Sequence, residues 1–460
     1  MIKKLILFLL FSFFFQSGKA QNEFITIWKP GNTSTNIAGV SLSTSNQIWF
    51  PGKGNQFNVY WEEIGYPQHN GILQNVTALK QFLIDFGDPQ NPTPANATYK
   101  VKISNGNGTF QAIRFPEGVY VSITLWPIFL EYNGDKEKIL EVSQWGNIIW
   151  ENMEWAFSEC IHMNVTATDA PDLSQITSTY GLFYNCTSLT GTPAFDTWNT
   201  SGITNMSHMF AGATNFNQPV GSWNTANVTN MNWLFHYLDF FNQPIGNWNT
   251  SKVTTMIHML HECYAFNQDL SSWDTSKVTD MRAILGKTTN FNHSLGNWNL
   301  NSLVLASGML TGSGLSCEKY NNTLMGWANN PATPNNLIIG DVSPMAYSSQ
   351  PALNARNNLI NTKGWTITGD YYNTECVSLS TSEVLSQNEI RIYPNPAADY
   401  IYIKNVKGFN TYKIFDMSGR IILQDLLNDE KINISSLIKG NYILQIITKD
   451  KVQSLKFIKN

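Results

Sequence analysis

Residues 216–240 read FNQPVGSWNTANVTNMNWLFHYLDF, and residues 241–265 repeat them as FNQPIGNWNTSKVTTMIHMLHECYA. The same pattern places a tryptophan every 25 residues, at Trp198, Trp223, Trp248, Trp273 and Trp298. A fixed period of this length predicts a stack of repeated units, in which each unit buries its apolar side against the next. We therefore expect the central region to be an array of stacked repeats.

The repeat extends to both sides of this stretch. Each unit has one large apolar residue, here called the anchor, and the anchors are Phe157, Phe183, Phe210, Phe235, Leu260, Leu285 and Leu310. Within one unit, Met206, Met209, Phe210 and Ala213 have the i, i+3, i+4, i+7 spacing of a short helical face. The β-branched and polar run 227–231 predicts a short strand. One strand and one helix per unit predict a leucine-rich-repeat-like α/β solenoid of about seven rungs. The alternatives are a β-helix or a propeller, although 25 residues are too few for a four-stranded blade.

The repeat phrases resemble a known family. FNQPVGSWNT (216–225), FNQDLSSWDT (266–275), AFSEC (156–160) and LFYNC (182–186) are similar to the BspA-family leucine-rich repeats of bacterial surface proteins. The resemblance covers about residues 140–370. It implies a surface-exposed protein associated with adhesion, and it implies no mechanism.

The last 70 residues have a different pattern. Seven short runs predict strands at 390–393, 400–404, 411–416, 421–427, 431–434, 442–448 and 452–458. This region resembles the type IX secretion C-terminal sorting domain (type A) of Bacteroidetes. The motif residues that carry the resemblance are Tyr393, Pro394, Asn395, Pro396, Gly419, Gly440 and Lys456. The resemblance implies passage across the outer membrane with the type IX machinery, followed by removal of the domain by a sortase.

The N-terminus predicts export. Lys3 and Lys4 precede an apolar run at 5–15, and small residues predict signal-peptide cleavage between Ala20 and Gln21. The run is too short to span a bilayer as a helix, and no later segment is apolar enough. We therefore expect a secreted protein of the extracellular space or outer-membrane surface, with no transmembrane segment in the mature chain.

Short β-rich runs at 46–50, 56–61, 98–103 and 119–125 predict a β-sandwich before the repeats. Residues 24–29 and 60–61 resemble the immunoglobulin-like module that precedes such repeats in BspA-family members. The expected order is a signal peptide (1–20), an immunoglobulin-like β-sandwich (21–135), the repeats (140–312), a C-terminal cap (313–376), a linker (377–387) and the sorting domain (388–460).

Composition and motifs argue against several functions. The chain has 29 Lys and Arg against 33 Asp and Glu, and it lacks a basic block that could neutralise a row of phosphates, so we expect no nucleic-acid partner. No nucleophile elbow, phosphate loop or His-Glu-x-x-His motif occurs. The sequence therefore predicts no catalytic residue, no cofactor and no enzyme activity.

The five cysteines divide into two groups. Cys160, Cys186 and Cys263 stand three residues after an anchor, where other units have apolar residues, so this position is interpreted as core. A bridge between Cys160 and Cys186 on adjacent units remains open. The favoured disulfide joins Cys317 and Cys376 in the cap.

Aromatic and histidine residues gather at two positions of the repeat, two residues before the anchor and one after it. Because these positions differ by three they share a side, and because they vary we expect them to face outward. The predicted ligand-binding strip, including the adjacent Tyr237, is Trp155, Tyr184, His208, Trp233, His236, Tyr237, His258 and His261. The alternative is that Trp155 and Trp233 fold over the rim and seal it. A metal site at His236 and His261 is not predicted, because no acidic residue repeats beside them.

These features favour non-catalytic adhesion or binding of an extracellular glycan or protein. One alternative is a carbohydrate-active enzyme with its site in residues 24–125, which should show a deep pocket with convergent acids. The other is a structural coat protein, which should lack an outward aromatic cluster.

Overall fold

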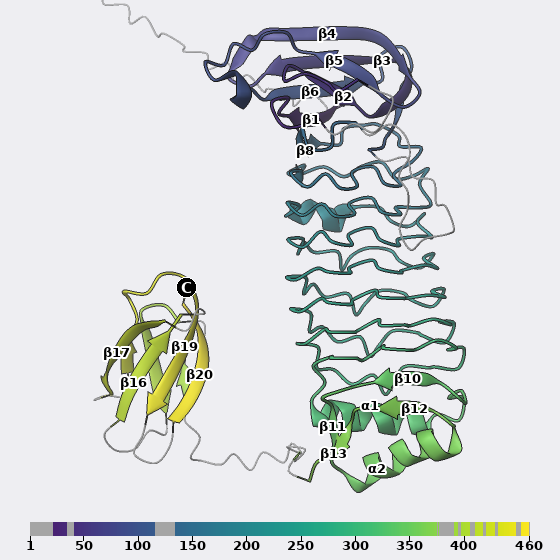
Figure 1. Cartoon of the computed structure of the whole chain (residues 1–460), viewed down its shortest axis with the longest axis vertical. Coiled ribbons are helices and arrows are strands. Elements are labelled where there is room, and N and C mark those ends of the chain that lie inside the picture. Colours follow the sequence, from purple (N-terminus) through teal and green to yellow (C-terminus); the bar gives the residue numbers. More distant parts are fainter. Residues whose placement is uncertain are drawn as a thin grey trace, which may run out of the picture. The chain divides into compact units, whose positions relative to one another are not determined.

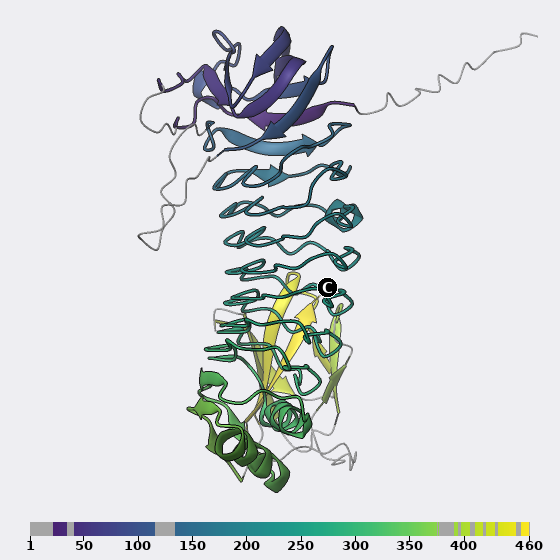
Figure 2. The ribbon, with the colours of Figure 1, turned by 90° about the vertical axis from the view of Figure 1, so that its right-hand side faces the viewer.

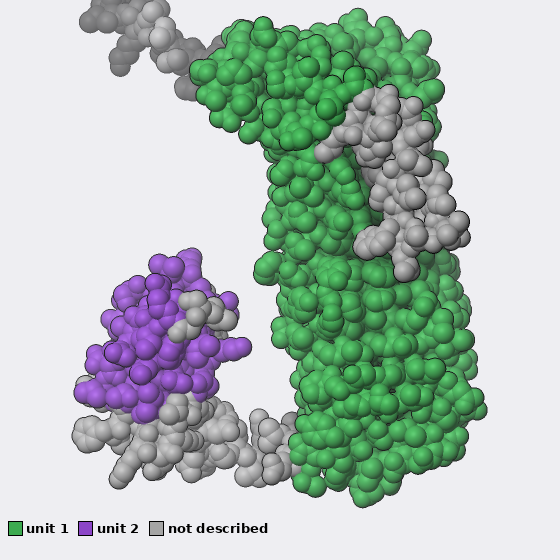
Figure 3. Space-filling model, in the orientation of Figure 1, with its two compact units in different colours: residues 1–378 green, residues 379–460 purple. Residues whose placement is uncertain are grey.

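The computed structural model describes residues 22–34, 41–115, 134–374 and 376, and then 391–393, 397–404, 410–416, 420–427, 431–447 and 452–459. The chain forms two compact units, Met1–Ser378 and Leu379–Asn460 (Figure 3). The predicted cleavage site at Ala20 and Gln21, the predicted strand at 119–125, and the motif residues Pro394, Asn395, Pro396 and Gly419 lie outside the described residues.

The first unit begins with a mixed sheet. Its strands are β1 (Phe24–Trp28), β3 (Gly52–Glu63), β4 (Tyr66–Ala78), β6 (Tyr99–Ser104), β7 (Thr109–Ile113), β8 (Ile139–Gln144) and β9 (Asn164–Val165). The strand order is β4-β3-β6-β1-β8-β9, β7 pairs with β3, and β2 (Gln47–Phe50) and β5 (Phe82–Asp85) form a separate pair. A short 3₁₀ turn, η1 (Pro94–Asn96), precedes β6. Since β8 pairs in parallel with β9 of the first rung, the sheet continues into the repeats.

The central region corrects the predicted fold class. The leucine-rich-repeat-like α/β solenoid is wrong, because residues 146–316 contain no α-helix and no strand longer than two residues. Each rung is instead a series of tight turns, interrupted once by the 3₁₀ turn η2 (Pro193–Thr197). The β pairing between adjacent rungs is limited to isolated parallel bridges, such as Asn205 with Asn230 and Asn230 with Thr255. Figures 1 and 2 show these turns one above another between the N-terminal sheet and the helices.

The backbone conformation explains why no helix forms. In every rung the residues two before and two after the anchor have positive φ, as Trp233 (59°) and Tyr237 (59°) do around Phe235. A left-handed residue interrupts the run of right-handed residues that an α-helix needs. The backbone amides of the rung therefore have two kinds of partner. Carbonyls of the next rung accept from the amides of Trp233, Phe235 and Tyr237. Carbonyls of the same rung accept from the amides of Leu234 and His236 and so close turns.

The apolar positions identified from the period do form the core. All seven anchors are fully buried, and so are Met231, Leu234 and Leu238 of the same rung as Phe235. The i, i+3, i+4, i+7 spacing therefore found the buried face, although the conformation that buries it is not helical. Cys160, Cys186 and Cys263 are buried free thiols, so adjacent Cys160 and Cys186 form no bridge. The Sγ atoms of Cys186 and Cys263 donate to carbonyls of the preceding rung at 2.9 and 2.8 Å.

A tryptophan row runs through the rungs. The Nε1 atoms of Trp223, Trp248, Trp273 and Trp298 donate to carbonyls of the preceding rung at 2.7, 3.0, 3.1 and 2.9 Å. The rings of Trp223 and Trp248 stack with centroids 6.2 Å apart. This contact satisfies a buried polar atom and aligns neighbouring rungs at once, which explains the regular spacing of tryptophan.

Helices and short strands end the first unit. They are α1 (Cys317–Asn329), β10 (Ile338–Asp341), β11 (Ala346–Tyr347), α2 (Gln350–Asn357), the π-helical turn η3 (Asn358–Thr362), β12 (Thr366–Thr368) and β13 (Tyr371–Tyr372). Trp327 of α1 continues the tryptophan row, because its Nε1 donates to the Leu295 carbonyl at 2.9 Å. A disulfide joins Cys317 to Cys376, with 6.0 Å between their Cα atoms. Among the described residues, no helix is both long and apolar enough to cross a membrane.

The second unit consists of two small sheets. Its strands are β14 (Arg391–Tyr393), β15 (Tyr400–Lys404), β16 (Asn410–Phe415), β17 (Ile421–Leu427), β18 (Lys431–Asn433), β19 (Gly440–Ile447) and β20 (Val452–Lys459). They form the sheets β14-β15-β18 and β17-β16-β19-β20, and both contribute to one apolar core. Each of the seven strands predicted from the sequence overlaps one of these. Of the predicted motif, Tyr393 ends β14, Gly440 begins β19, and Lys456 lies in β20 opposite Ile443.

Candidate functional site

The predicted strip becomes a continuous row of ring contacts along the rungs. Trp155 contacts Tyr184, and Tyr184 contacts His208. His208 then stacks on Trp233 with centroids 5.6 Å apart, and Trp233 stacks on His258 at 4.1 Å. His236 and His261 complete the row, with centroids 5.1 Å apart. The two repeat positions therefore do share one side of the rungs. We call this row of rings, from Trp155 to His261, the histidine row.

The expectation that this strip faces outward is wrong for most of its members. Trp155 and His236 are only 6% and 7% exposed, and Tyr184, His208, Trp233, His258 and His261 are half-buried. Tyr237 is the exception, with 46% of its surface exposed. The rings stack edge and face against one another across rungs, and this stacking removes them from solvent.

Several of these side chains occupy strained backbone positions. Trp155, His208, Trp233 and His258 stand two residues before an anchor with φ between 52° and 59°. Gly181 and Gly308 fill the same position in other rungs. A non-glycine residue in this conformation costs about 1–2 kcal/mol. Ala283 has the same conformation at this position of its rung, so the rungs accept this cost.

The histidines of the row are neutral at pH 7. Burial lowers the pKa of His208 to about 4. Burial, together with the nearby His261 and His258, lowers the pKa of His236 to about 3. Burial and then His261 and Arg282 lower the pKa of His258 to about 4, and burial lowers that of His261. Neutral imidazoles offer a lone pair to a ligand or a metal ion.

Four imidazole nitrogens in this row are buried without a hydrogen-bond partner among the described residues. They are the Nδ1 atoms of His208, His236, His258 and His261. The His261 Nδ1 lies 4.0 Å from the Glu262 Oε1, which is beyond hydrogen-bond distance. Buried polar atoms are normally satisfied, so four orphans in one row need an explanation.

A hollow of about 340 Å³ opens beside the row. Its lining is Tyr180, Asn205, Ser207, His208, Asn230, Asn232 and Trp233. The Oδ1 atoms of Asn205 and Asn230 accept from the backbone amides two residues later, at 3.0 and 2.9 Å. Within the described residues their Nδ2 groups make no hydrogen bond, so these donors remain for a ligand. Aromatic side chains and amide donors thus line the same hollow, and none of its seven lining residues is acidic.

Next to the row lies an exposed group of aromatic rings, called the aromatic face: Tyr237, Phe240 and Tyr264, which are 46%, 58% and 40% exposed. The Ala265 amide donates to the Asp239 carbonyl at 3.2 Å, so the segments that carry Phe240 and Tyr264 are adjacent. At the equivalents of Phe240, other rungs have Asn215, Ala265 and Asn290.

Glu262 connects the aromatic face to the histidines. Its carboxylate accepts from Lys287 Nζ at 2.6 Å and from the hydroxyls of Tyr237 and Tyr264. Burial alone would raise the pKa of Glu262, but the Lys287 hydrogen bond, the adjacent His261 and the Tyr237 hydroxyl hold it below its usual value. The carboxylate is therefore charged at neutral pH and fixes both tyrosine rings.

The sequence analysis missed Tyr180, Phe240 and Glu262, and it also missed the asparagines of the hollow, Asn205, Asn230 and Asn232. Tyr180 and Phe240 stand at variable repeat positions, so the comparison that found Trp233 could have found them. Glu262 stands where Lys287 and Gly312 follow in later rungs, and no sequence signal distinguishes its role.

A second hollow, of about 310 Å³, lies where the N-terminal sheet meets the first rung. Pro51, Lys53, Leu79, Lys80, Ala112, Arg114, Glu151 and Asn152 line it. Glu151 is the only acid of this lining, and it pairs with Lys53 at 3.6 Å. The convergent acids expected of a glycosidase in residues 24–125 are thus missing from the described lining.

Comparison with known families adds two findings. Residues 391–460 match the family described as secretion system C-terminal sorting domain. Residues 151–249 and 220–327 match the family described as Mycoplasma protein of unknown function, DUF285. No curated protein matches the chain.

The match of residues 391–460 to the sorting-domain family indicates the export route. The chain is exported by the type IX secretion system, to the cell surface or the extracellular space. The match of the rungs is only weakly compatible with the predicted BspA-type repeats, and neither match is to a leucine-rich-repeat family.

Proposed function

We propose that the exported chain is a non-catalytic binding protein that captures an extracellular glycan in the hollow beside the histidine row, and so takes part in adhesion. The observation that carries the proposal is the lining of that hollow by the rings of Tyr180, His208 and Trp233 and by the amides of Asn205, Asn230 and Asn232. Aromatic side chains make apolar contacts with the C–H groups of sugars, and amides donate to sugar hydroxyls.

Backbone strain supports the same site. Trp233 and His208 take a conformation in which glycine would be free of cost. A ligand that contacts those rings would give them a role in addition to their stacking across rungs.

A glycan fits this site better than a protein partner does. The hollow is within the size range of small-ligand sites, about 300–1,000 Å³, and its polar groups are amides, hydroxyls and a neutral imidazole. A protein partner would use a wider apolar surface with buried anchors. The aromatic face, with Tyr237, Phe240 and Tyr264, can extend contact with a longer glycan.

The two other functions weighed from the sequence have less support. Hydrolysis of a glycosidic bond generally uses two carboxyl groups, and neither hollow has such a pair in its described lining. A structural coat protein should lack an outward aromatic cluster, whereas Tyr237, Phe240 and Tyr264 are exposed. Removal of the sorting domain by a sortase, on the cell surface, is part of the proposal.

An array of glycans and matrix proteins, probed with residues 21–378, tests the proposal. This fragment contains the first compact unit and its complete apolar core. We expect binding to a restricted set of glycans, and loss of that binding in Trp233→Ala. The matched control is Tyr372→Ala, which removes an aromatic ring of 43% exposure far along the chain. Binding to proteins alone, or glycan binding unaffected by Trp233→Ala, would contradict the proposal.

A further inference from the structure

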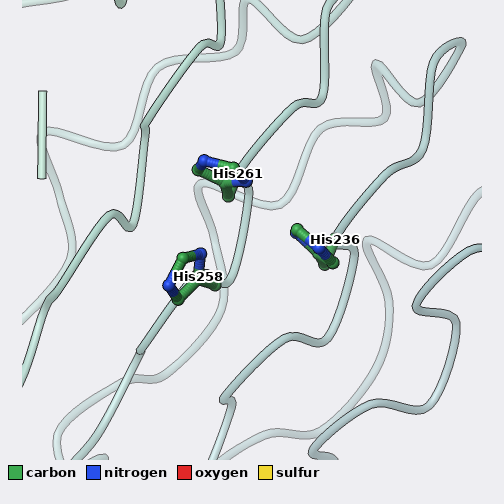
Figure 4. A group of neighbouring side chains, drawn as sticks. All are labelled: His236, His258 and His261. Atoms are coloured by element: carbon green, nitrogen blue, oxygen red, sulfur yellow. The ribbon is translucent and has the colours of Figure 1, made fainter. Parts of the chain in front are cut away.

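Three histidines from two adjacent rungs converge next to the aromatic face. His258 and His261 stand two before and one after the anchor Leu260, and His236 stands one after the anchor Phe235. One nitrogen from each ring lies within 4.8 Å of the other two (Figure 4). We call these three residues the histidine cluster.

We propose that the histidine cluster is a zinc site, in which His236, His258 and His261 supply three imidazole ligands and water supplies the fourth. Three histidines with an open fourth position are a zinc donor set. This inference does not depend on glycan binding.

The geometry fits the ion with a small adjustment. Zinc–nitrogen bonds of about 2.0–2.1 Å in a tetrahedron place the ligand nitrogens about 3.3–3.4 Å apart. The three nitrogens lie within 4.8 Å of one another, so zinc binding requires them to move closer together by up to about 1.5 Å. The Nδ1 atoms of all three rings are buried without partners among the described residues, and a metal bond would satisfy such atoms.

The next rung leaves room for this arrangement. A Cβ atom at Gly286 would lie 2.6 Å from the His261 Cδ2, so any larger residue would push the ring away. The position equivalent to Gly286 holds Ala211 in another rung, so the rung backbone accepts alanine. Space for the His261 ring explains the glycine.

The charges around the cluster permit a cation. Arg282 pairs with Asp280 at 2.8 Å and Lys287 pairs with Glu262 at 2.6 Å, so each nearby positive charge is compensated. The Glu262 carboxylate lies 4.0 Å from the His261 Nδ1, and its charge is balanced by Lys287. No uncompensated cation among the described residues therefore opposes a bound ion.

Calorimetric titration of residues 21–460 with Zn²⁺ alone, after treatment with a chelator and without an affinity tag, tests the site. We expect one ion per chain. His258→Gln and His261→Gln should each weaken binding by more than the about 10–100-fold that loss of an outer-sphere partner costs. His293→Gln is the matched control, since Gln218, Gln243 and Gln268 stand at the same repeat position, and it should leave binding unchanged.

A variant outside the three ligands tests the site with less risk of misfolding. Gly286→Ala should weaken zinc binding by displacing the His261 ring while the near-ultraviolet circular dichroism of the tryptophan row stays unchanged. Co²⁺ in place of zinc should give the intense visible bands of a tetrahedral site without a thiolate charge-transfer band. Absence of a one-to-one site, equal binding by all histidine variants, or a thiolate band from Cys263 would overturn the proposal.

Discussion

Two rows of rings run along the same rungs, and they differ in whether their buried ring nitrogens have hydrogen-bond partners. In the tryptophan row every Nε1 from Trp223 to Trp298 donates to a carbonyl of the preceding rung. In the histidine row the Nδ1 atoms of His208, His236, His258 and His261 have no partner among the described residues. The first row repeats one residue without change, while the second changes from rung to rung.

This difference in hydrogen bonding means that the two rows contribute differently to the stability of the stack. A satisfied buried donor adds about 0.5–1.5 kcal/mol, whereas an orphaned one costs about 1–3 kcal/mol. The tryptophan row therefore stabilises the stack. The histidine row holds strained residues and orphaned atoms, which is the condition expected of a site kept for binding.

The largest effect should follow from breaking the core that both rows cover. Met231→Asp places a carboxylate at a fully buried position, and we expect a loss of about 4 kcal/mol or more in the free energy of unfolding. Urea denaturation of residues 21–378 measures it. Asn224→Asp is the control, because Asp274 already stands at the same repeat position, and it should change stability by less than about 0.5 kcal/mol. Equal stability of the two variants would show that Met231 is not core.

The period revealed this core but not the conformation around it. A spacing of i, i+3, i+4, i+7 is shared by an α-helix and by a turn series that alternates right-handed and left-handed residues. The left-handed residues include Trp233, Tyr237 and Lys287, which have no intrinsic preference for that conformation, so no composition signal exposed it. Only the inter-rung hydrogen bonds determine it.

The site was likewise only half predictable. The rule that residues three apart share a side brought His258 and His261 together correctly. It could not show that rings of adjacent rungs stack and exclude water, as Trp233 and His258 do at 4.1 Å. Nor could it reveal the orphaned nitrogens, because those depend on the absence of partners in three dimensions.

The second prediction compares one tryptophan from each row. Trp248→Ala removes a ring that is 4% exposed together with its hydrogen bond, and we expect a loss of about 3–5 kcal/mol. Trp233→Ala removes a half-buried ring without that bond, and Ala283 stands at the same position, so about 1–2 kcal/mol is expected. Thermal unfolding of both variants decides. Equal losses would mean that Trp233 seals the rim and is structural.

The third prediction uses pH to separate the rows, since tryptophan does not titrate. The pKa of His208 is lowered to about 4 in the folded chain, so the unfolded chain binds its proton first as pH falls. Stability from this group is complete above about pH 6.5 and is lost as pH falls toward 4. At pH 5 the loss is about 1–2 kcal/mol, reduced because the ring is partly exposed.

Urea denaturation of metal-free protein at pH 7 and pH 5 measures this loss. Between pH 7 and pH 5 the wild type should lose more stability than His208→Gln does. Some loss should remain in the variant, because the pKa values of His236 and His258 are also lowered. The same pH dependence in both proteins would show that His208 is not buried as a neutral ring.

The smallest effect on stability is expected at the aromatic face, where stability and glycan binding can be compared in a single variant. Phe240 is 58% exposed, and Asn215 and Asn290 stand at its equivalents. Asn215 donates from its Nδ2 to the Thr187 carbonyl at 2.7 Å, so an asparagine at 240 suits the rung backbone. Phe240→Asn should therefore change the free energy of unfolding by less than about 0.5 kcal/mol. If the ring contacts a longer glycan, affinity should fall by about tenfold, or about 1.4 kcal/mol. Unfolding and glycan binding measured on the same variant separate a residue kept for stacking from one kept for binding, because only the second predicts lost affinity at constant stability.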